Sequence, residues 1–539
     1  MDRRVFLHSA LTAGVAVQLA PREDGAPAVG LSSPKTPSPP FELEEATVAA
    51  LQQGMTSGRW TARSITEAYL ARIEAMDHQG PAINSVIEVN PDALAIADRM
   101  DQERKAGKTR GPLHGIPVLV KDNLDTGDRM MTTAGSLALA GSSAPRDSTV
   151  VARLREAGAV LLGKTNLSEW ANFRSTRSTS GWSGRGGLTK NPYALNRNAC
   201  GSSSGSGSAA AANFAAITIG TETDGSITCP SSIAGLVGIK PTVGLVSRTG
   251  IIPISATQDT AGPMCRTVAD AAAVLAAIQG FDASDAATTP MRTRPAPDYL
   301  AELRPDGLKG ARLGVARKGF GQRGHLEPLL AGAIAALKHL GAEIVDPADI
   351  PNVEKLGDPE GVVLDYEFKA GIAAYLATRR GGPAFPMKTL ADLIAFNSAN
   401  REKEMPWFGQ EIFERCEKRG PLTTPEYLKA RAECRRLSRQ LGIDAIMARH
   451  RLDAIVAITE GPAWVTDLVT GDHFTGDDTT PAAVAGYPHL TVPAGMVHGL
   501  PVGLSFFGRA WSEGALIRYG YGFEQGTRHR RPPQFLPAI

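Results

Sequence analysis

The stretch CGSSSGSGSAAAANFAAITIGTETDGSITCPSSIAGLVGIKPT, which runs from Cys200 to Thr242, decides how the chain is interpreted. It opens with a Gly/Ser loop, passes through an Ala-rich run and a β-branched run, and then makes a second Gly/Ser turn at 224–226. This order predicts a loop, a helix, a strand and a second loop. The first amides of a helix lack partners inside the helix, so a Gly/Ser loop that leads into one exposes backbone N–H groups. Two serines, Ser202 and Ser226, therefore lie at opposite ends of one compact unit.

Two other interpretations of the Gly/Ser loop are weaker. Its composition is typical of a flexible linker, but a linker leads to a domain boundary and this loop leads directly into apolar sequence. Residues 201–205 also match the G-x-S-x-G pattern of a lipase-like nucleophile elbow, with Ser203 at the centre. An elbow needs a buried strand directly before it, and the polar residues 196–200 cannot form one.

The stretch resembles the signature of the amidase signature family of serine hydrolases, which has a GGSSGG loop followed by GxDxGGSIRxP and GxKPT. Ser202 matches the first loop serine, and Ser226 stands at the position of the family's nucleophile. The family's catalytic lysine ends an apolar strand in a GxPxxxKDN motif. Residues 115–123, GIPVLVKDN, supply it here as Lys121. The resemblance extends from about Phe41 to the C-terminus.

The resemblance implies hydrolysis of an amide through an acyl-enzyme, without a metal or another cofactor. In this scheme Ser226 attacks the carbonyl carbon, Ser202 follows a cis peptide bond and relays protons, and Lys121 acts as base and later as acid. A serine hydroxyl is a weak nucleophile at neutral pH and needs an adjacent base. Ser–Lys arrangements are an established alternative to Ser–His–Asp. Lys121 must be neutral to accept a proton, and burial at the end of a strand would favour this by lowering its pKa.

The resemblance also implies an oxyanion hole of backbone amides, since attack on a carbonyl creates a charge that needs preorganised donors. The residues implied are Thr223, Asp224, Gly225 and Ser226. The sequence departs from the family pattern here, because the family commonly has Gly at Asp224, Asp at Glu222 and Arg at Thr228. A carboxylate at Asp224 could disfavour anionic substrates or pair with a substrate N–H. The missing arginine argues against a free carboxylate in the substrate.

The segments TETDGSITCP, at 221–230, and 244–264 are similar to the bacterial peptide amidase branch, whose members remove the C-terminal amide from peptides. We therefore expect a peptide or other small-molecule amide as substrate, with release of ammonia. The alternatives are an amidotransferase A-type subunit and a family member acting on small aryl or aliphatic amides. A Ser–His–Asp esterase would need a histidine, but His489 and His498 match structural positions of the family, and we assign them no catalytic role.

A nucleotide-binding protein is a further class to consider, because residues 158–165, GAVLLGKT, satisfy the phosphate-loop pattern G-x-x-x-x-G-K-[ST]. That loop has to follow a strand and open a helix. Here a predicted helix precedes the segment and its interior is continuous and apolar, so the segment predicts a buried strand instead.

The composition is that of a globular protein, with 42% hydrophobic and 21% charged residues among 539. The net charge of +2 indicates no nucleic acid and no anionic lipid surface as partner. We expect one large α/β domain at 41–539, with a mixed central sheet flanked by helices. Within it, a signature core at about 110–280 precedes a cap-like substrate insert at about 282–421, and strands at about 450–525 complete the sheet. No feature of the sequence determines the oligomeric state.

The N-terminus, MDRRVFLHSALTAGVAVQLA, resembles a twin-arginine export signal, with Arg3 and Arg4 before a short apolar run. An A-x-A site at 26–28 predicts a signal peptide over residues 1–28, and the Ser/Pro-rich residues 29–40 predict a disordered spacer. We expect export to the periplasm or secretion, without stable membrane insertion.

Five cysteines show no metal-type spacing. Cys200 and Cys229 flank the two serine motifs and could form a bridge, although small buried thiols are the favoured interpretation.

Overall fold

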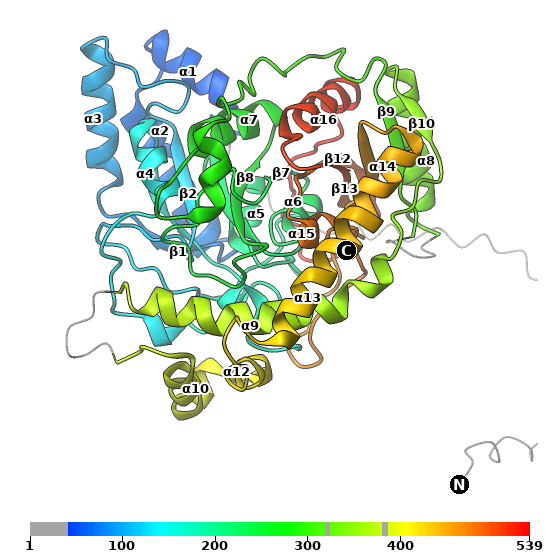
Figure 1. Ribbon diagram of the computed structural model, residues 1–539. Coiled ribbons are helices and arrows are strands. Elements are labelled where there is room, and N and C mark those ends of the chain that lie inside the picture. The colour runs from blue at the N-terminus through cyan, green and yellow to red at the C-terminus, as the bar shows by residue number, and fades with distance from the viewer. Residues whose placement is uncertain (1–40, 319–323, 380–385) are drawn as a thin grey trace, which may run out of the picture. The chain divides into compact units, whose positions relative to one another are not determined.

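The computed structural model describes residues 41–318, 324–379 and 386–539 of the chain (Figure 1). The signal peptide and spacer expected at residues 1–40 lie outside these ranges. Within the described ranges, no helix combines the length and the apolar character needed to cross a membrane.

A mixed sheet of 11 strands, in the order β1-β3-β2-β6-β8-β7-β12-β13-β11-β9-β10, forms the centre of the described chain. β2 pairs in parallel with β3 and β6, and β9 pairs in parallel with β10 and β11, whereas the other pairs are antiparallel. Its strands are β1 (Val86–Val89), β2 (Pro117–Lys121), β3 (Val160–Thr165), β6 (Ile217–Glu222), β7 (Val237–Lys240), β8 (Thr260–Cys265), β9 (Arg312–Val315), β10 (Glu343–Val345), β11 (Ala454–Ile458), β12 (His489–Val497) and β13 (Leu500–Phe507). A short pair, β4 (Trp182–Ser183) and β5 (Gly187–Leu188), stands apart.

Helices flank this sheet (Figure 1). They are α1 (Val48–Thr56), α2 (Ala62–Ile73), α3 (Ala93–Lys105), α4 (Thr149–Glu156), α5 (Ser204–Ala211), α6 (Thr228–Ile233), α7 (Val268–Ile278), α8 (Glu327–His339), α9 (Gly357–Leu376), α10 (Leu390–Ala399), α11 (Arg401–Glu404), α12 (Glu411–Glu417), α13 (Pro425–Arg435), α14 (Asp444–His450), α15 (Thr480–Ala485) and α16 (Glu513–Thr527). The predicted α/β fold, a single large domain with a mixed central sheet, is confirmed.

The three parallel strands β2, β3 and β6 are buried along their whole length. The apolar residues of β2 and β3 are nearly continuous, as expected for strands covered on both faces. The supposed phosphate loop is part of β3, so the prediction of a strand there is confirmed. Because parallel strands end at the same sheet edge, Lys121 at the end of β2 comes close to the turn that follows β6.

The helices α9, α10, α12 and α13 gather on one side of the molecule, at the bottom of Figure 1. A second apolar cluster, which includes Phe368 of α9 and Phe413 of α12, joins α9, α10 and α12 to Trp170. The first part of the range expected to form the cap belongs to the main sheet instead. β9 and β10 lie at one edge of this sheet, and α8 connects them in sequence. β11, β12 and β13 complete the sheet from the C-terminal part of the chain.

Two helix ends show distinctive local geometry. α2 begins with a capping box in which the Thr61 side chain accepts from the Ser64 amide and Ser64 is the reciprocal partner. A π-helical segment separates α13 from α14. Gly442 has non-helical backbone angles there, and a Cβ at this position would lie 2.4 Å from the Leu437 carbonyl oxygen.

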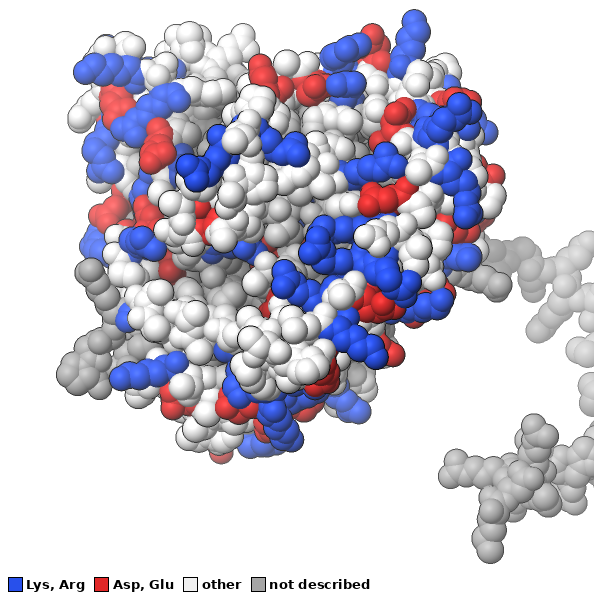
Figure 2. Space-filling model, viewed as in Figure 1, with Lys and Arg blue, Asp and Glu red and all other residues white. Residues whose placement is uncertain are grey.

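Charges of both signs are interspersed over the face drawn in Figure 2, with blue side chains gathered over α13 and α14. These Lys and Arg residues form a solvated basic face on this segment.

Candidate active site

Lys121 is completely buried at the end of β2. Burial lowers the pKa of Lys121 from 10.5 to about 7, although the charges of Asp259 and Glu222 act in the opposite direction. An ammonium group loses its hydration when it is buried, so the neutral amine is favoured. A substantial share of Lys121 is therefore a neutral amine near neutral pH.

The Lys121 amino group contacts three hydroxyls. Its Nζ lies 2.8 Å from Ser202 Oγ, 3.0 Å from Ser203 Oγ and 2.9 Å from Thr221 Oγ1. Ser203 Oγ donates its own hydrogen to the Thr221 carbonyl oxygen at 3.0 Å, so it accepts from the lysine. A neutral amine has two hydrogens and one lone pair. With the hydrogens directed to Ser203 and Thr221, the lone pair is left for the Ser202 hydroxyl.

Ser202 and Ser226 come from the two Gly/Ser turns at either end of the α5–β6 unit. The peptide bond between Gly201 and Ser202 is cis. Ser202 is fully buried, whereas Ser226 is 8% exposed and lines a cavity. No hydrogen bond joins their two hydroxyls in the described chain. The segments are linked instead by the Ser203 amide, which donates to the Ser226 carbonyl oxygen at 3.2 Å.

The turn between β6 and α6 presents its backbone to the same cavity. Among the described residues, no protein acceptor binds its four consecutive N–H groups. These amides belong to Thr223, Asp224, Gly225 and Ser226. Gly225 has a φ of +74°, which favours glycine, and a Cβ there would lie 3.1 Å from Thr479 Oγ1. The turn therefore holds free donors beside Ser226.

Asp224 lines the cavity and is also tied to α15. Its Oδ1 accepts from Thr479 Oγ1 at 2.6 Å and its Oδ2 accepts from Thr480 Oγ1 at 2.7 Å. Both carboxylate oxygens are therefore engaged at the start of α15. Asp224 fastens the turn to the C-terminal part of the domain, and the pairing of its carboxylate with a substrate N–H stays a prediction.

Asp259 and Glu222 hold the turn from its other sides, although the sequence motifs assign a role to neither. Asp259 accepts from Thr223 Oγ1 at 2.6 Å, and burial raises its pKa to about 6. Glu222 accepts from the Ile227 and Thr228 amides at 2.8 and 2.9 Å, which places a carboxylate at the start of α6. Carboxylates at a helix start are stabilised by its free amides.

A cavity of about 480 Å³ opens in front of Ser226. One wall is apolar and includes Leu364 of α9, Ile412 of α12 and Phe173. The opposite wall carries Asp472 and the aromatic ring of Phe474 from the loop at 461–479. Of the three predicted catalytic side chains, Ser226 alone lines this cavity, while Ser202 and Lys121 lie behind it.

Cys200 and Cys229 form a disulfide, so the interpretation as separate buried thiols was wrong for this pair. The two residues are 29 positions apart but both line the cavity, because the serine loop and α6 meet there. Cys265, Cys416 and Cys434 are free and buried.

The model of the protein family described as "Amidase" matches residues 64–517. The chain belongs to the amidase signature family. It hydrolyses an amide C–N bond, as the family and the structural neighbours described next indicate.

This amidase is 53% identical to the native peptide amidase from Stenotrophomonas maltophilia, whose solved structure it matches with a TM-score of 0.88 over 92% of this chain and 99% of that one. It is 42% identical to a protein described as "Probable amidase" from Arabidopsis thaliana, over 94% of this chain and 95% of the relative. It is also 35% identical to the A-type subunit of the glutamyl-tRNA(Gln) amidotransferase of Chloroflexus aurantiacus, over 92% and 99% of the two chains.

The other candidate residues of this amidase lie away from the cavity or behind it. Ser203, the centre of the elbow pattern, is fully buried and does not line the cavity. His489 is buried on β12 with its Nε2 2.6 Å from Ser505 Oγ, and burial lowers its pKa to about 3. Lys164 is buried and donates to the Leu124 carbonyl oxygen at 2.7 Å, which supports the loop after Lys121.

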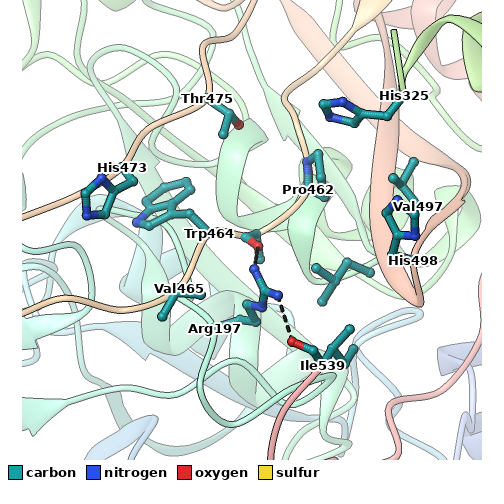
Figure 3. A pocket seen from close by; sticks show the side chains of 12 residues that line it. Arg197, His325, Pro462, Trp464, Val465, His473, Thr475, Val497, His498 and Ile539 are labelled. Atoms are coloured by element: carbon teal, nitrogen blue, oxygen red, sulfur yellow. Dashed lines mark hydrogen bonds between the residues drawn. The ribbon is translucent and has the colours of Figure 1, made fainter. Parts of the chain in front are cut away.

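A larger cavity of about 810 Å³ contains none of the predicted catalytic residues of the amidase (Figure 3). Its lining includes Trp464 and three histidines, His325, His473 and His498, around Arg197. Arg197 donates to the Ile539 carbonyl oxygen at 2.8 Å (Figure 3). The histidines are too dispersed to form a metal site. In the part of the chain that the structure describes, one group brings three potential metal ligands together: Cys200, Cys229 and Glu460.

Proposed function

We propose that this amidase removes the C-terminal amide of peptides through a covalent intermediate on Ser226. The observation that carries the mechanism is the buried Lys121, which has its lone pair available to Ser202 and lies behind the cavity that Ser226 lines. In this arrangement the nucleophile Ser226 lies at the cavity, and the relay Ser202 and the base Lys121 lie behind it in the protein interior.

In the proposed acylation step, Ser226 Oγ attacks the amide carbonyl carbon and passes its proton to Ser202 Oγ. Ser202 gives its own proton to neutral Lys121. The developing oxyanion receives hydrogen bonds from free N–H groups in the 223–226 turn, and one such donor is typically worth roughly 10²–10³ in rate. The lysine proton then returns through Ser202 to the leaving nitrogen, and ammonia departs. Water then hydrolyses the ester between the acyl group and Ser226. Lys121 accepts the water proton through Ser202 and returns a proton to Ser226 Oγ.

The peptide-amide substrate is supported by the 53% identity to the peptide amidase from Stenotrophomonas maltophilia. The cavity is also consistent with it, because about 480 Å³ with one apolar wall can accept an amino-acid side chain together with its backbone. The similarity to the Chloroflexus aurantiacus subunit supports a role in an amidotransferase as an alternative function. Hydrolysis of small aryl or aliphatic amides is the third candidate function.

The test is ammonia release from an N-blocked dipeptide amide by the purified chain, beside a Ser226→Ala variant. Release that depends on Ser226 supports the proposal. If benzamide or a fatty amide is hydrolysed and the dipeptide amide is not, the mechanism stands and the substrate class is wrong. If turnover survives Ser226→Ala, the mechanism itself is wrong.

We also propose that the amidase is exported in the folded state. The Arg3-Arg4 pair supports this, and so does the Cys200–Cys229 disulfide, since disulfides persist mainly in oxidising compartments. Replacement of both arginines by lysine should retain the full-length precursor inside the cell, as seen by fractionation. Unchanged export would contradict the proposal.

A further inference from the structure

The group Cys200, Cys229 and Glu460 joins three elements beside the active site. Cys200 belongs to the serine loop, Cys229 to α6, and Glu460 follows β11. One ligand atom from each lies within 4.8 Å of the other two. The Glu460 Oε2 is 3.5 Å from Cys200 Sγ, and all three side chains are buried.

We propose that reduction of the disulfide turns this group into a binding site for one thiophilic divalent cation of the Zn²⁺ class, set in the wall of the catalytic cavity. Two thiolates and a carboxylate are ligands that Zn²⁺ prefers, with Zn–S bonds of about 2.3 Å. The two cysteines line the cavity, so a water molecule from it can complete a tetrahedral set.

The backbone around the two cysteines is held independently of the disulfide bond. The Cys200 amide donates to Asn198 Oδ1 at 2.7 Å, and the Cys229 amide donates to the Gly225 carbonyl oxygen at 2.8 Å. Asn198 is in turn fixed by its own donation to the Ser180 carbonyl oxygen at 3.0 Å. The thiols formed by reduction therefore stay near each other and near the Glu460 carboxyl group.

A phosphine is the reductant for the disulfide. The phosphine and one water molecule convert the disulfide into two thiols, and the phosphine becomes a phosphine oxide. Binding of the cation then displaces two thiol protons, because the thiolate is the metal ligand. The oxidised protein cannot bind in this way, since both sulfur atoms are already bonded to each other.

The experiment is a titration of the full chain with Cd²⁺ alone, followed by the ultraviolet charge-transfer band of cadmium–thiolate bonds. Protein reduced with the phosphine and then freed from it under argon is compared with oxidised protein. We expect the band to saturate at one equivalent in the reduced protein only. No band in the reduced protein, including the case in which the native disulfide resists the phosphine, would overturn the proposal.

Variants identify the ligands without relying on activity. Cys200→Ser and Cys229→Ser should each remove most of the band, and Glu460→Gln should weaken Cd²⁺ binding. Cys434→Ser, which alters a free buried thiol on α13, should leave the titration unchanged. A band that survives in Cys200→Ser, or disappears in folded Cys434→Ser, places the cation elsewhere and overturns the assignment. Circular dichroism establishes that each variant is folded.

Hydrolysis provides a second readout of where the cation binds. Cys200 is two residues before Ser202 and Cys229 is three residues after Ser226, so a bound cation alters the cavity wall close to both serine segments. Zn²⁺ is expected to remove most turnover from the reduced amidase and to leave the oxidised amidase unaffected. Full turnover with one cation bound would contradict a position in this wall.

Discussion

Lys121 owes its altered chemistry to the groups that surround it. In the described chain its hydrogen-bond partners are hydroxyls and one carbonyl oxygen, so no carboxylate hydrogen-bonds to its ammonium form. Burial is then the largest influence on its pKa, and it favours the neutral form. A direct ion pair would have kept the lysine protonated and unable to act as a base.

The pH dependence of hydrolysis should report this pKa. Because the pKa of Lys121 is lowered to about 7, the amine is neutral above that pH and protonated below it. We expect kcat/KM for a neutral amide to rise as the pH increases to about 7, to level off above it, and to fall about tenfold per pH unit well below it. Measurement between pH 5 and 9 tests this.

Asp259 provides the control, because its pKa of about 6 lies close enough to produce a similar inflection. In Asp259→Asn the inflection should persist and move to lower pH, since the charge that raises the lysine pKa is gone. If the inflection disappears in this variant, Asp259 and not Lys121 limits activity at low pH.

Ser203 separates the proposed mechanism from a nucleophile elbow. Ser203→Ala removes one acceptor from Lys121 but leaves Ser226 in place, so we expect turnover to fall only about tenfold, the value of roughly one hydrogen bond. Turnover of the folded variant, measured beside Ser226→Ala, decides the question. Activity as low as that of Ser226→Ala would favour Ser203 as nucleophile.

The fixed spacing of the motifs predicts that Lys121, Ser202 and Ser226 form one site; Lys121 Nζ does lie 2.8 Å from Ser202 Oγ, and the catalytic roles of the three residues stay predictions. The sequence was not sufficient to predict the groups that hold them. Thr221 and Asp259 lie far apart in the chain and reach the site only because β6 and β8 are neighbours. Side-chain contacts of this kind have no local pattern that a sequence can reveal.

At the scale of elements, the turn between β6 and α6 is fastened at both ends. Glu222 holds the first amides of α6, and Asp224 holds the loop before α15. Free donors are effective in catalysis only when they are held in position before the reaction. The contacts of Glu222 and Asp224 therefore hold the 223–226 amides in a fixed orientation.

Asp224→Asn tests this role. An amide at this position has one acceptor oxygen for two threonine hydroxyls, so the turn loses one of its two ties. We expect kcat to fall by roughly 10²-fold, the usual value of an oxyanion donor, with little change in KM. Thr480→Val removes only the hydrogen bond from Thr480 Oγ1 to Asp224 Oδ2, and it should lower kcat by less than Asp224→Asn does. Unchanged kcat in folded Asp224→Asn would show that the turn is positioned by other contacts.

Strands were predictable where the apolar pattern was regular, as in β2 and β3. The break between α13 and α14 was not, because the basic pattern continues through it. The break coincides with the non-helical backbone of Gly442, where a Cβ would lie 2.4 Å from the Leu437 carbonyl oxygen.

For the whole molecule, the cap helices are joined to the sheet by a buried ion pair as well as by apolar contacts. Arg379, just after α9, lies 3.1 Å from Asp125 Oδ1 and also donates to the Thr132 and Ser142 carbonyl oxygens at 3.0 Å. Asp125 follows the Lys121 strand, so this pair connects the cap to the segment that carries the base.

Arg379→Ala should lower the free energy of unfolding by about 3–5 kcal/mol, because it leaves a buried carboxylate without its partner. Arg436→Ala removes an arginine from a half-exposed pair with Glu433 and should cost at most about 1 kcal/mol. Urea unfolding of both variants measures the difference. Equal effects would mean that Arg379 is solvated in solution.

The architecture was predictable as a single α/β domain, but the strand order was not. β9 and β10 fall within the range expected for the cap. β9 joins the sheet by pairing with β11, more than 100 residues further on, and β10 is added at the edge by pairing with β9. Pairing over such distances depends on the three-dimensional arrangement, and the short strands carry too little pattern to indicate it.

Part of the wall of the cavity that opens in front of Ser226 comes from segments that carry none of the three proposed catalytic side chains. Leu364 and Ile412 come from the cap, and Phe474 comes from the loop before α15, whereas Lys121 and Ser202 are buried behind Ser226. A library that randomises these three positions would vary the wall and leave the groups of the proton relay unchanged. Directed evolution of new amide specificities can therefore begin on this scaffold without rebuilding its reaction chemistry.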